Sequence, residues 1–319
     1  MIYTVTMNPA IDCAMDAGTV VRGRVNRAAS QTLRFSGKGI NVSYVLREFG
    51  GNSTLLGLIA GFTGDALEAG LTSDGFRCDF VRLSQGVTRI NVKLSEDSDS
   101  DTEINAPGPT PTRDELRALS EKLSRLSHGD TAVISGSMPS GVGADYVREL
   151  TSAVPDGVKI VCDLSGDALR VSLNFSPFLV KPNIHELYEL LGIPQTNETL
   201  SDMALVKDAA ERLISMGAEN ALITMGADGA YFISDSGVGH FIPAPRMSPA
   251  CGALSAVGCG DSTVAGLLIG MGLAGDSVRD AAYAITGAAG PAELAVIFGT
   301  ASYFKGFPPS PEKLHLTTA

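Results

Sequence analysis

Short apolar runs alternate with helical patterns along most of the chain. The strand-like runs cover residues 2–7, 53–60, 131–136, 159–164, 178–183 and 220–226. Several of them are continuously apolar, as expected for strands that are buried on both faces of a parallel sheet. Helical patterns cover residues 38–50, 112–126, 143–153, 184–192, 203–217 and 259–274. The alternation predicts a three-layer α/β/α fold, with a largely parallel sheet between two layers of helices.

Two segments break this alternation, because residues 12–36 and 87–106 carry strand patterns without a helix between them. Residues 87–94, VTRINVKL, alternate strictly. One face of this strand carries Val87, Arg89, Asn91 and Lys93, and the other can pack. We expect a small β-sheet, inserted into the α/β core, that covers a ligand cleft like a lid and has the acidic residues 95–103 at its tip. An ordinary solvated strand is the alternative.

Size and charge narrow the class of protein. The chain has 319 residues, of which 44% are hydrophobic, and it contains neither an internal repeat nor a low-complexity linker. One domain over residues 1–319 is therefore expected. The formal net charge is −11, and no run of five Lys or Arg occurs. Binding to nucleic acid or to an anionic membrane needs a basic face, so neither partner is expected.

Targeting and metal-binding patterns also narrow the class. The first residues, MIYTVTMNPAID, lack the basic and apolar regions of a signal peptide. The apolar stretches 263–274 and 281–303 are respectively too short and too interrupted to cross a bilayer, so we expect a soluble cytoplasmic protein. The five cysteines form no C-x-x-C pair and the four histidines form no metal pattern, which disfavours a disulfide framework and a structural zinc site.

Residues 255–266, SAVGCGDSTVAG, contain the first candidate for chemistry. The third glycine of a dinucleotide-binding fingerprint is missing, so a Rossmann-type loop is disfavoured. Apolar residues recur at helical spacing after Cys259, which predicts a helix that begins there. Gly258 and Gly260 leave backbone amides uncovered and the helix dipole adds positive charge, so this N-terminus is a candidate anion site.

Two side chains lie at this candidate anion site. Asp261, in the first turn, is either a general base beside a bound phosphate or an ordinary first-turn acid. The Cys259 thiol is predicted to have a lowered pKa at a helix N-terminus, and therefore to be sensitive to oxidation or alkylation.

Other stretches also suit a phosphate ligand. In LVKPNIHEL, Asn183 and Glu186 share one face of a helix start, where they form either a cap or an oxygen pair that organises Mg²⁺. Residues 222–232, LITMGADGAYF, form either a β-hairpin or a glycine turn that lies against a nucleotide. Residues 35–50 open a helix with GKG and present a cation and bare amides, and Asp12 follows the first strand at the sheet edge where ligands bind.

Nine motifs occur in order along the chain, namely NPAID, VNR, SGKGINVS, TRINVKL, TEINAPGP, SGSMPSGV, KPNIHEL, MGADGAYF and VGCGDSTVAG. Together they resemble the PfkB (ribokinase-like) carbohydrate kinases, most closely the branch that contains 1-phosphofructokinase and tagatose-6-phosphate kinase. The resemblance extends from Met1 to about residue 300. It implies a ribokinase-like core with an inserted β-sheet lid, and a homodimer formed through that lid.

The resemblance also implies a role for each matching residue. Asp261 is expected to take the proton from the acceptor hydroxyl, while the amides of Gly258, Cys259 and Gly260 steady the transferred phosphoryl group. Asn183 is expected at the nucleotide phosphates and Glu186 at Mg²⁺, through water. The rest of the nucleotide site is expected to be lined by Thr224, Gly226, Ala227, Asp228 and Gly229.

On the sugar side, the resemblance implies that Asp12 holds the sugar hydroxyls. Arg27 and Arg89, from the two lid segments, are expected to bind the phosphate that the substrate already carries, and Ser137 is expected to border the same cleft. The sugar site is completed by Gly37, Lys38, Gly39 and Asn41.

These expectations describe a kinase that uses ATP and Mg²⁺ to phosphorylate the 6-hydroxyl of fructose 1-phosphate. Tagatose-6-phosphate kinase is the alternative, since both enzymes need a bound phosphate at one end and a free hydroxyl at the other. Arg27 and Arg89 together disfavour a kinase for an unphosphorylated sugar or a nucleoside. From another class, a catalytically silent sugar-phosphate-binding regulator is disfavoured by the presence of Asp261, Asn183 and Glu186.

Overall fold

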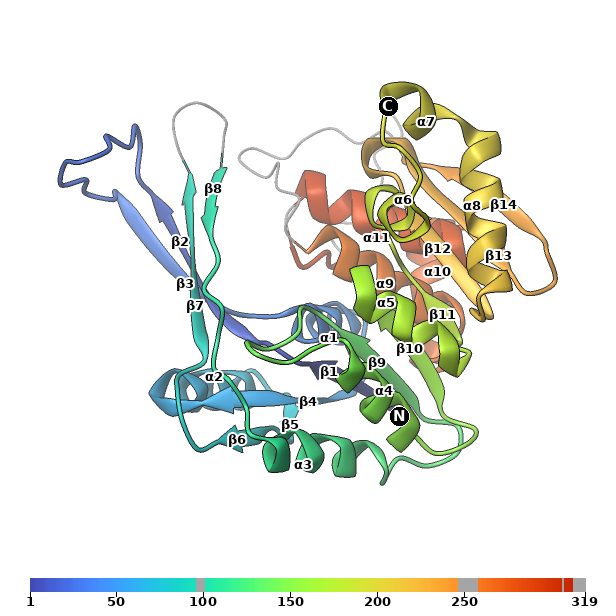
Figure 1. Ribbon diagram of the computed structural model, residues 1–319. Coiled ribbons are helices and arrows are strands. Elements are labelled where there is room, and N and C mark those ends of the chain that lie inside the picture. The colour runs from blue at the N-terminus through green and yellow to red at the C-terminus, as the bar shows by residue number, and fades with distance from the viewer. Residues whose placement is uncertain (96–100, 246–257, 306, 312–319) are drawn as a thin grey trace.

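The computed structural model describes residues 1–95, 101–245, 258–305 and 307–311 (Figure 1). Its centre is a large, mostly parallel sheet, as predicted. The parallel strands, in spatial order, are β12 (Asn220–Thr224), β11 (Leu179–Val180), β10 (Lys159–Asp163), β9 (Thr131–Ser135), β1 (Ile2–Thr6), β4 (Ser53–Ala60) and β5 (Arg77–Cys78), and β6 (Val81–Leu83) pairs with the end of β4. Two antiparallel strands, β13 (Gly229–Ser234) and β14 (Gly239–Pro243), extend one edge.

Helices cover both faces of this sheet (Figure 1). One face packs against α3 (Arg113–Leu123), α4 (Asp145–Ala153), α5 (Gly166–Ser172), α6 (Ile184–Leu191) and α8 (Met203–Ser215). The other face packs against α1 (Lys38–Glu48), α9 (Cys259–Gly270), α10 (Asp276–Thr286) and α11 (Pro291–Lys305). The short helix α7 (Asn197–Ser201) precedes α8, and α2 (Gly61–Ser73) lies beside β4. These layers confirm the predicted α/β/α class.

Some elements differ from the sequence prediction, for physical reasons. The strand expected at 178–183 is reduced to β11, since Pro182 has no N–H to donate to a ladder. The predicted helix at 259–274 ends at Gly270. Helices α2, α5, α7, α10 and α11 were not predicted. Helix α11 is apolar around most of its circumference and therefore lacks the period of an amphipathic helix, while α2 contains three glycines that obscure its pattern.

A second, four-stranded sheet forms the predicted lid and stands out from the body of the molecule (Figure 1). Its order is β3 (Ser30–Ser36), β2 (Ala10–Asp16), β7 (Arg89–Ser95) and β8 (Asp101–Ile104). The register places Asp12 opposite both Asn91 and Arg34, so one face of the lid is polar and charged. Of the predicted acidic tip, residues 96–100 lie outside the described residues.

Within the described ranges, no single helix is long and apolar enough to span a membrane. Helices α10 and α11 reach that length and apolar character only when taken together, and they are bent by 66° relative to one another.

Candidate active site

A cavity of about 1160 Å³ opens where β10, β11 and β12 end. It brings together residues that lie far apart in the sequence, from Lys38 at the start of α1 to Tyr303 on α11. The predicted residues that line it are Lys38, Asn183, Glu186, Thr224, Gly226, Ala227, Asp228, Gly229, Gly258, Cys259, Gly260 and Asp261. The predicted catalytic and nucleotide-binding residues therefore share one cavity.

The N-terminus of α9 forms one wall of this cavity. The helix begins at Cys259, as predicted, and its N-cap Gly258 has φ 77°, in the left-handed region that favours glycine. The N-cap is a glycine, so it offers no side-chain acceptor to the first-turn amides of the helix. Residues 255–257 of the predicted loop lie outside the described residues.

Asp261 lies in the first turn of α9 and is buried. Its Oδ2 accepts a hydrogen bond of 2.7 Å from Nδ2 of Asn41, on α1. Burial, reinforced by the negative charge of Asp163, raises the pKa of Asp261 to about 6, although the Asn41 hydrogen bond and the ammonium groups of Lys38 and Lys181 act in the opposite direction. The carboxylate can thus take up a proton near neutral pH.

Two ion pairs that share one buried carboxylate lie close to Asp261. The fully buried Asp163, at the end of β10, contacts the Lys38 ammonium at 3.2 Å and the Lys181 ammonium at 3.1 Å. Burial alone would raise the pKa of Asp163, but the two ammonium groups hold it below its ordinary value. Both lysines are thereby fixed at the cavity wall, where Lys181 Nζ would lie 3.4 Å from a Cβ placed on Gly260.

Asn183 and Glu186 form a helix cap, which was one of the two arrangements that the sequence allowed. Asn183 Oδ1 accepts from the Glu186 amide, and Glu186 Oε2 accepts from the Asn183 amide, both at 2.8 Å. This capping box begins α6, and the same two residues also line the cavity. The reciprocal bonds orient the Glu186 carboxylate and thereby fix the position of its other oxygen, Oε1.

The glycine-rich stretch 222–232 is the β-hairpin that the sequence left open, and it also lines the cavity. Strands β12 and β13 pair in antiparallel register around a single 3₁₀ turn at Gly226–Asp228. The ladder fixes the turn, so the backbone around Gly226 is presented to the cavity by a rigid hairpin.

The start of α1 is packed tightly against the ends of β1 and β9. A Cβ on Gly39 would lie 2.7 Å from Thr6 Oγ1 and 3.2 Å from Ser135 Oγ, so this approach requires glycine. Gly37 is the N-cap of the helix, with φ 141°. The close approach places Lys38 in the cavity and Asn41 against Asp261.

The remaining predicted residues lie outside the cavity lining. Asp12 is within strand β2 of the lid rather than in a loop after the first strand, and it is held by Asn91 Nδ2 at 2.9 Å and Lys93 Nζ at 3.0 Å. Arg89 donates to the Asn8 carbonyl oxygen at 2.9 and 3.2 Å, and to the Ala106 carbonyl oxygen at 3.3 Å. This guanidinium therefore ties the lid to the body.

Arg27 and Ser137 are both exposed. Arg27 lies in the loop between β2 and β3, and Ser137 follows the end of β9. Arg89 pairs with Ala10 at the start of β2, whereas the loop that holds Arg27 follows the other end of that strand, so the two arginines lie at opposite ends of β2.

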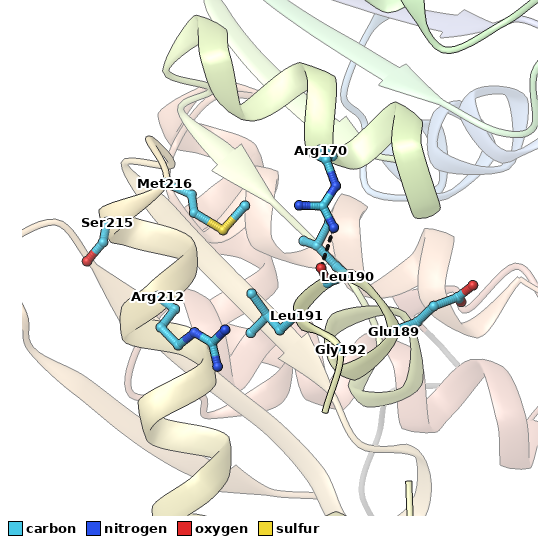
Figure 2. A pocket seen from close by; sticks show the side chains of 8 residues that line it. All are labelled: Arg170, Glu189, Leu190, Leu191, Gly192, Arg212, Ser215 and Met216. Atoms are coloured by element: carbon cyan, nitrogen blue, oxygen red, sulfur yellow. Dashed lines mark hydrogen bonds between the residues drawn. The ribbon is translucent and has the colours of Figure 1, made fainter. Parts of the chain in front are cut away.

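A second hollow, of about 610 Å³, lies between the end of α6 and α8 (Figure 2). Figure 2 shows Arg170 donating to the carbonyl oxygen of Leu190, at the C-terminal end of α6. The predicted site residues are all elsewhere, since its lining consists of Arg170, Glu189, Leu190, Leu191, Gly192, Arg212, Ser215 and Met216.

Comparison with known proteins decides the family. Residues 5–289 match the family model described as pfkB family carbohydrate kinase. This chain belongs to the pfkB family. It is a phosphotransferase that acts on a sugar hydroxyl, and the lid and the α/β core described above are those of a ribokinase-like fold.

Individual relatives agree with the family. The 1-phosphofructokinase of Bacillus subtilis is 36% identical over 275 residues, covering 85% of this chain and 86% of that protein. The D-tagatose-1-phosphate kinase of Bacillus licheniformis is 32% identical over 220 residues, covering 69% and 70%. The structure of a tetrameric inhibited form of phosphofructokinase-2 from Escherichia coli has a TM-score of 0.81 and 26% identity, and covers 98% of this chain and 96% of that chain.

The sequence reasoning missed two charged residues of this pfkB-family site. Asp163 and Lys181 lie at the ends of β10 and β11, two strands that were predicted. A charged residue at the carboxyl end of a buried strand is the pattern that could have identified both as site residues. Helix α11, which was not predicted, adds Val296, Gly299 and Tyr303 to the cavity wall.

The lowered pKa expected for Cys259 is wrong. Burial raises the pKa of this thiol to about 11, with the negative charge of Asp261 acting in the same direction. Burial of the sulfur therefore outweighs the effect of the helix N-terminus, and the thiol stays protonated at neutral pH.

Cys259 in the folded pfkB-family kinase should react slowly with iodoacetamide. At pH 8 we expect alkylation on the order of 100-fold slower than for a free cysteine of pKa about 8.5, because the thiolate is the nucleophile. Peptide mass spectrometry over time measures the rate at this residue. In urea the rate should rise to the free value; equal rates in the folded and unfolded protein would contradict the raised pKa.

Proposed function

We propose that this protein is an ATP-dependent 1-phosphofructokinase, built as one PfkB-type kinase domain, that converts fructose 1-phosphate into fructose 1,6-bisphosphate. The observation that carries the mechanism is the buried Asp261 carboxylate beside the uncapped N-terminus of α9 and two ammonium groups. The 36% identity to a relative named 1-phosphofructokinase supports the substrate. The relative named D-tagatose-1-phosphate kinase makes a tagatose phosphate the second candidate.

In this mechanism, Asp261 accepts the proton of the 6-hydroxyl as its oxygen attacks the γ-phosphorus of ATP. The bond from that phosphorus to the bridging oxygen of ADP breaks, and ADP leaves with the electron pair. Asn41 orients the carboxylate through its 2.7 Å hydrogen bond. A pKa of about 6 keeps Asp261 ionised at neutral pH and leaves it more basic than an exposed aspartate.

Phosphoryl transfer asks a protein mainly for positioning and for compensation of charge. The first amides of α9, at Gly258, Cys259 and Gly260, would receive the transferred group, and the dipole of this helix adds a partial positive charge. Lys38 and Lys181 line the same cavity and would offset the charge of the nucleotide phosphates. The hairpin turn around Gly226 would lie against the rest of the nucleotide.

The donor set at the start of α6 fits Mg²⁺ held through water and phosphate oxygens. Asn183 and Glu186 offer oxygen ligands at the cavity wall, and one Glu186 oxygen is already engaged in the capping box. Mg²⁺ keeps several waters and binds through one or two carboxylates plus substrate phosphates. When bound, it would neutralise phosphate charge.

On the sugar side, we propose that Asp12 binds sugar hydroxyls and that Arg89 and Arg27 bind the phosphate already on the sugar, with Ser137 at the border of the same cleft. The closeness of Asp12 to the cationic lid residue Lys93 supports a sugar site under the lid. Three of the Arg89 contacts are to carbonyl oxygens, which leaves two of its five N–H groups for a phosphate. Arg27, in an exposed loop, would need a movement of that loop or a second subunit to reach the phosphate.

A coupled ADP-release assay tests the proposed reaction. The panel contains fructose 1-phosphate, fructose 6-phosphate, tagatose 1-phosphate, tagatose 6-phosphate, and the free sugars. We expect the highest kcat/KM with fructose 1-phosphate. A tagatose phosphate as the best substrate would replace the first assignment by the second. No turnover with any phosphorylated sugar would instead favour a silent sugar-phosphate-binding regulator.

The Asp261→Asn variant should bind both substrates and lose about 10²–10⁴-fold in kcat, as expected for a lost general base. In the wild type, kcat/KM should fall as the pH drops through about 6, because protonated Asp261 cannot accept a proton. Asp276→Asn is the matched control, since it removes an exposed first-turn acid of α10 outside the cavity. An active Asp261→Asn enzyme would place the base elsewhere.

We further propose that two copies of the chain associate through the outer face of the lid. On this face Leu33, Ile104 and Ile90 are 61%, 59% and 43% exposed. The strand register places all three on the same side of the sheet, where they form an apolar strip. Contiguous exposed apolar side chains of this kind are typical of interaction surfaces. The opposite face of the same sheet carries Asp12 and Lys93, so the lid can serve a ligand and a partner at once.

Leu33→Asp should convert this dimer to monomer, because burying a carboxylate in the strip costs more than the contact gains. Size-exclusion chromatography with light scattering measures the mass of each variant. Val238→Asp, at an apolar position that is 65% exposed and far from the lid, between β13 and β14, should leave the mass unchanged. A wild-type chain that is monomeric at micromolar concentration would exclude the lid interface.

A further inference from the structure

The polar face of the lid carries a cation that none of the nine motifs points to. Arg34 lies on β3, directly opposite Asp12 on β2, and Asn91 follows in the same row on β7. Residues paired in this way share one face of a sheet. Arg34 therefore belongs to the face of the lid that holds the proposed sugar site.

The Arg34 guanidinium is held by an aromatic ring and not by a carboxylate. Its Cζ lies 4.0 Å from the ring centroid of Phe307 and 6.0 Å from that of Tyr44. A guanidinium over an aromatic face is attracted by the ring quadrupole, and the attraction strengthens on desolvation. Between residues 1 and 311, as far as they are described, no carboxylate lies within ion-pair distance of Arg34.

The nearby carboxylates are already engaged with other groups. Asp12 contacts Asn91 and Lys93, and Asp261 accepts from Asn41. Arg34 still lies within their electrostatic reach: burial lowers the pKa of Arg34, while Tyr44, Asp12 and Asp261 act to raise it. Arginine stays charged at neutral pH, so this guanidinium is a half-buried positive charge that forms no ion pair with the described residues.

Phe307 connects this charge to the proposed anion hole. The ring packs so closely on Gly258, the N-cap of α9, that a Cβ at that position would collide with it. Phe307 also packs against the core formed by α9 and α11. Arg34 is thus fixed between a lid strand and the helix that carries Asp261, and its side chain cannot simply turn away to solvent without losing the stacking.

We propose that Arg34 is a positioning residue that makes the cleft select an anionic sugar. It rests on the proposed kinase function and adds a source of substrate choice. Because the guanidinium forms no ion pair with the described residues, it favours a sugar that brings its own negative charge. An uncharged sugar gains nothing from it. The stacking on Phe307 keeps the charge at this place whether or not substrate is bound.

The decisive variant is Arg34→Gln, compared with Arg34→Lys, which keeps the charge. For Arg34→Gln we expect KM for fructose 1-phosphate to rise roughly tenfold, the size of one lost charge-assisted interaction, with KM for ATP unchanged. Arg34→Lys should recover most of the affinity. Calorimetric titration with fructose 1-phosphate gives the same comparison without turnover.

A pH profile separates an electrostatic role from a structural one. Asp261 is faced by Lys38, Lys181 and Asp163 as well as by Arg34. Only Arg34 is changed, so losing its positive charge should move the acid limb of kcat/KM to higher pH in Arg34→Gln and not in Arg34→Lys.

Arg47→Gln is the matched control, because Arg47 stacks on Phe76 at 4.5 Å, away from the cavity. It should lower thermal stability by a similar amount and leave KM and the acid limb unchanged. If Arg34→Gln behaves like Arg47→Gln, Arg34 is structural and the proposal is wrong while the kinase function stands. If the wild type neither binds nor phosphorylates fructose 1-phosphate, the proposed function fails and this selection fails with it.

Discussion

The buried carboxylate of Asp163 is the constraint on which the site depends. A carboxylate without access to water must be paired, and here two ammonium groups, from Lys38 and Lys181, share it. One lysine belongs to the glycine loop that starts α1, and the other follows β11. The two ion pairs therefore hold the loop that starts α1 and the segment that follows β11 at one point. They also set the electrostatics of Asp261, whose pKa reflects burial and Asp163 against the two lysines.

The distribution of charge explains how an acidic chain can handle two phosphate-bearing ligands. The net charge is −11, yet Lys38, Lys181, Arg34 and Lys93 are collected around the cleft. Each of these cations is fixed by a specific contact, either with a buried carboxylate or with an aromatic ring. A few positioned charges and helix amides suffice, because phosphate in a desolvated site interacts strongly with each of them.

Several residues stabilise a helix or a hairpin and also line the cavity, so the two interpretations of these stretches are compatible. Asn183 and Glu186 cap α6 and also line the cavity, and residues 222–232 are a hairpin whose turn faces the same space. Satisfied backbone groups make these elements rigid, and rigidity is what a transferring phosphoryl group needs from its surroundings. The two faces of the lid differ in chemistry, because alternate side chains of a strand point to opposite faces and here separate polar from apolar residues.

The sequence by itself determined the α/β class, the lid segments and the helix that begins at Cys259, because these follow from local periodicity and from glycine and capping chemistry. It also indicated Asp261, Asn183 and Glu186 as candidates. Only the tertiary structure decided that Asp163 and Lys181 meet, that Arg34 stacks on Phe307, and that the Cys259 thiol has a raised rather than a lowered pKa. Burial and contacts between residues on different elements leave no local pattern, since they depend on how the strands are ordered in the sheet and not on the residues next to them in the chain.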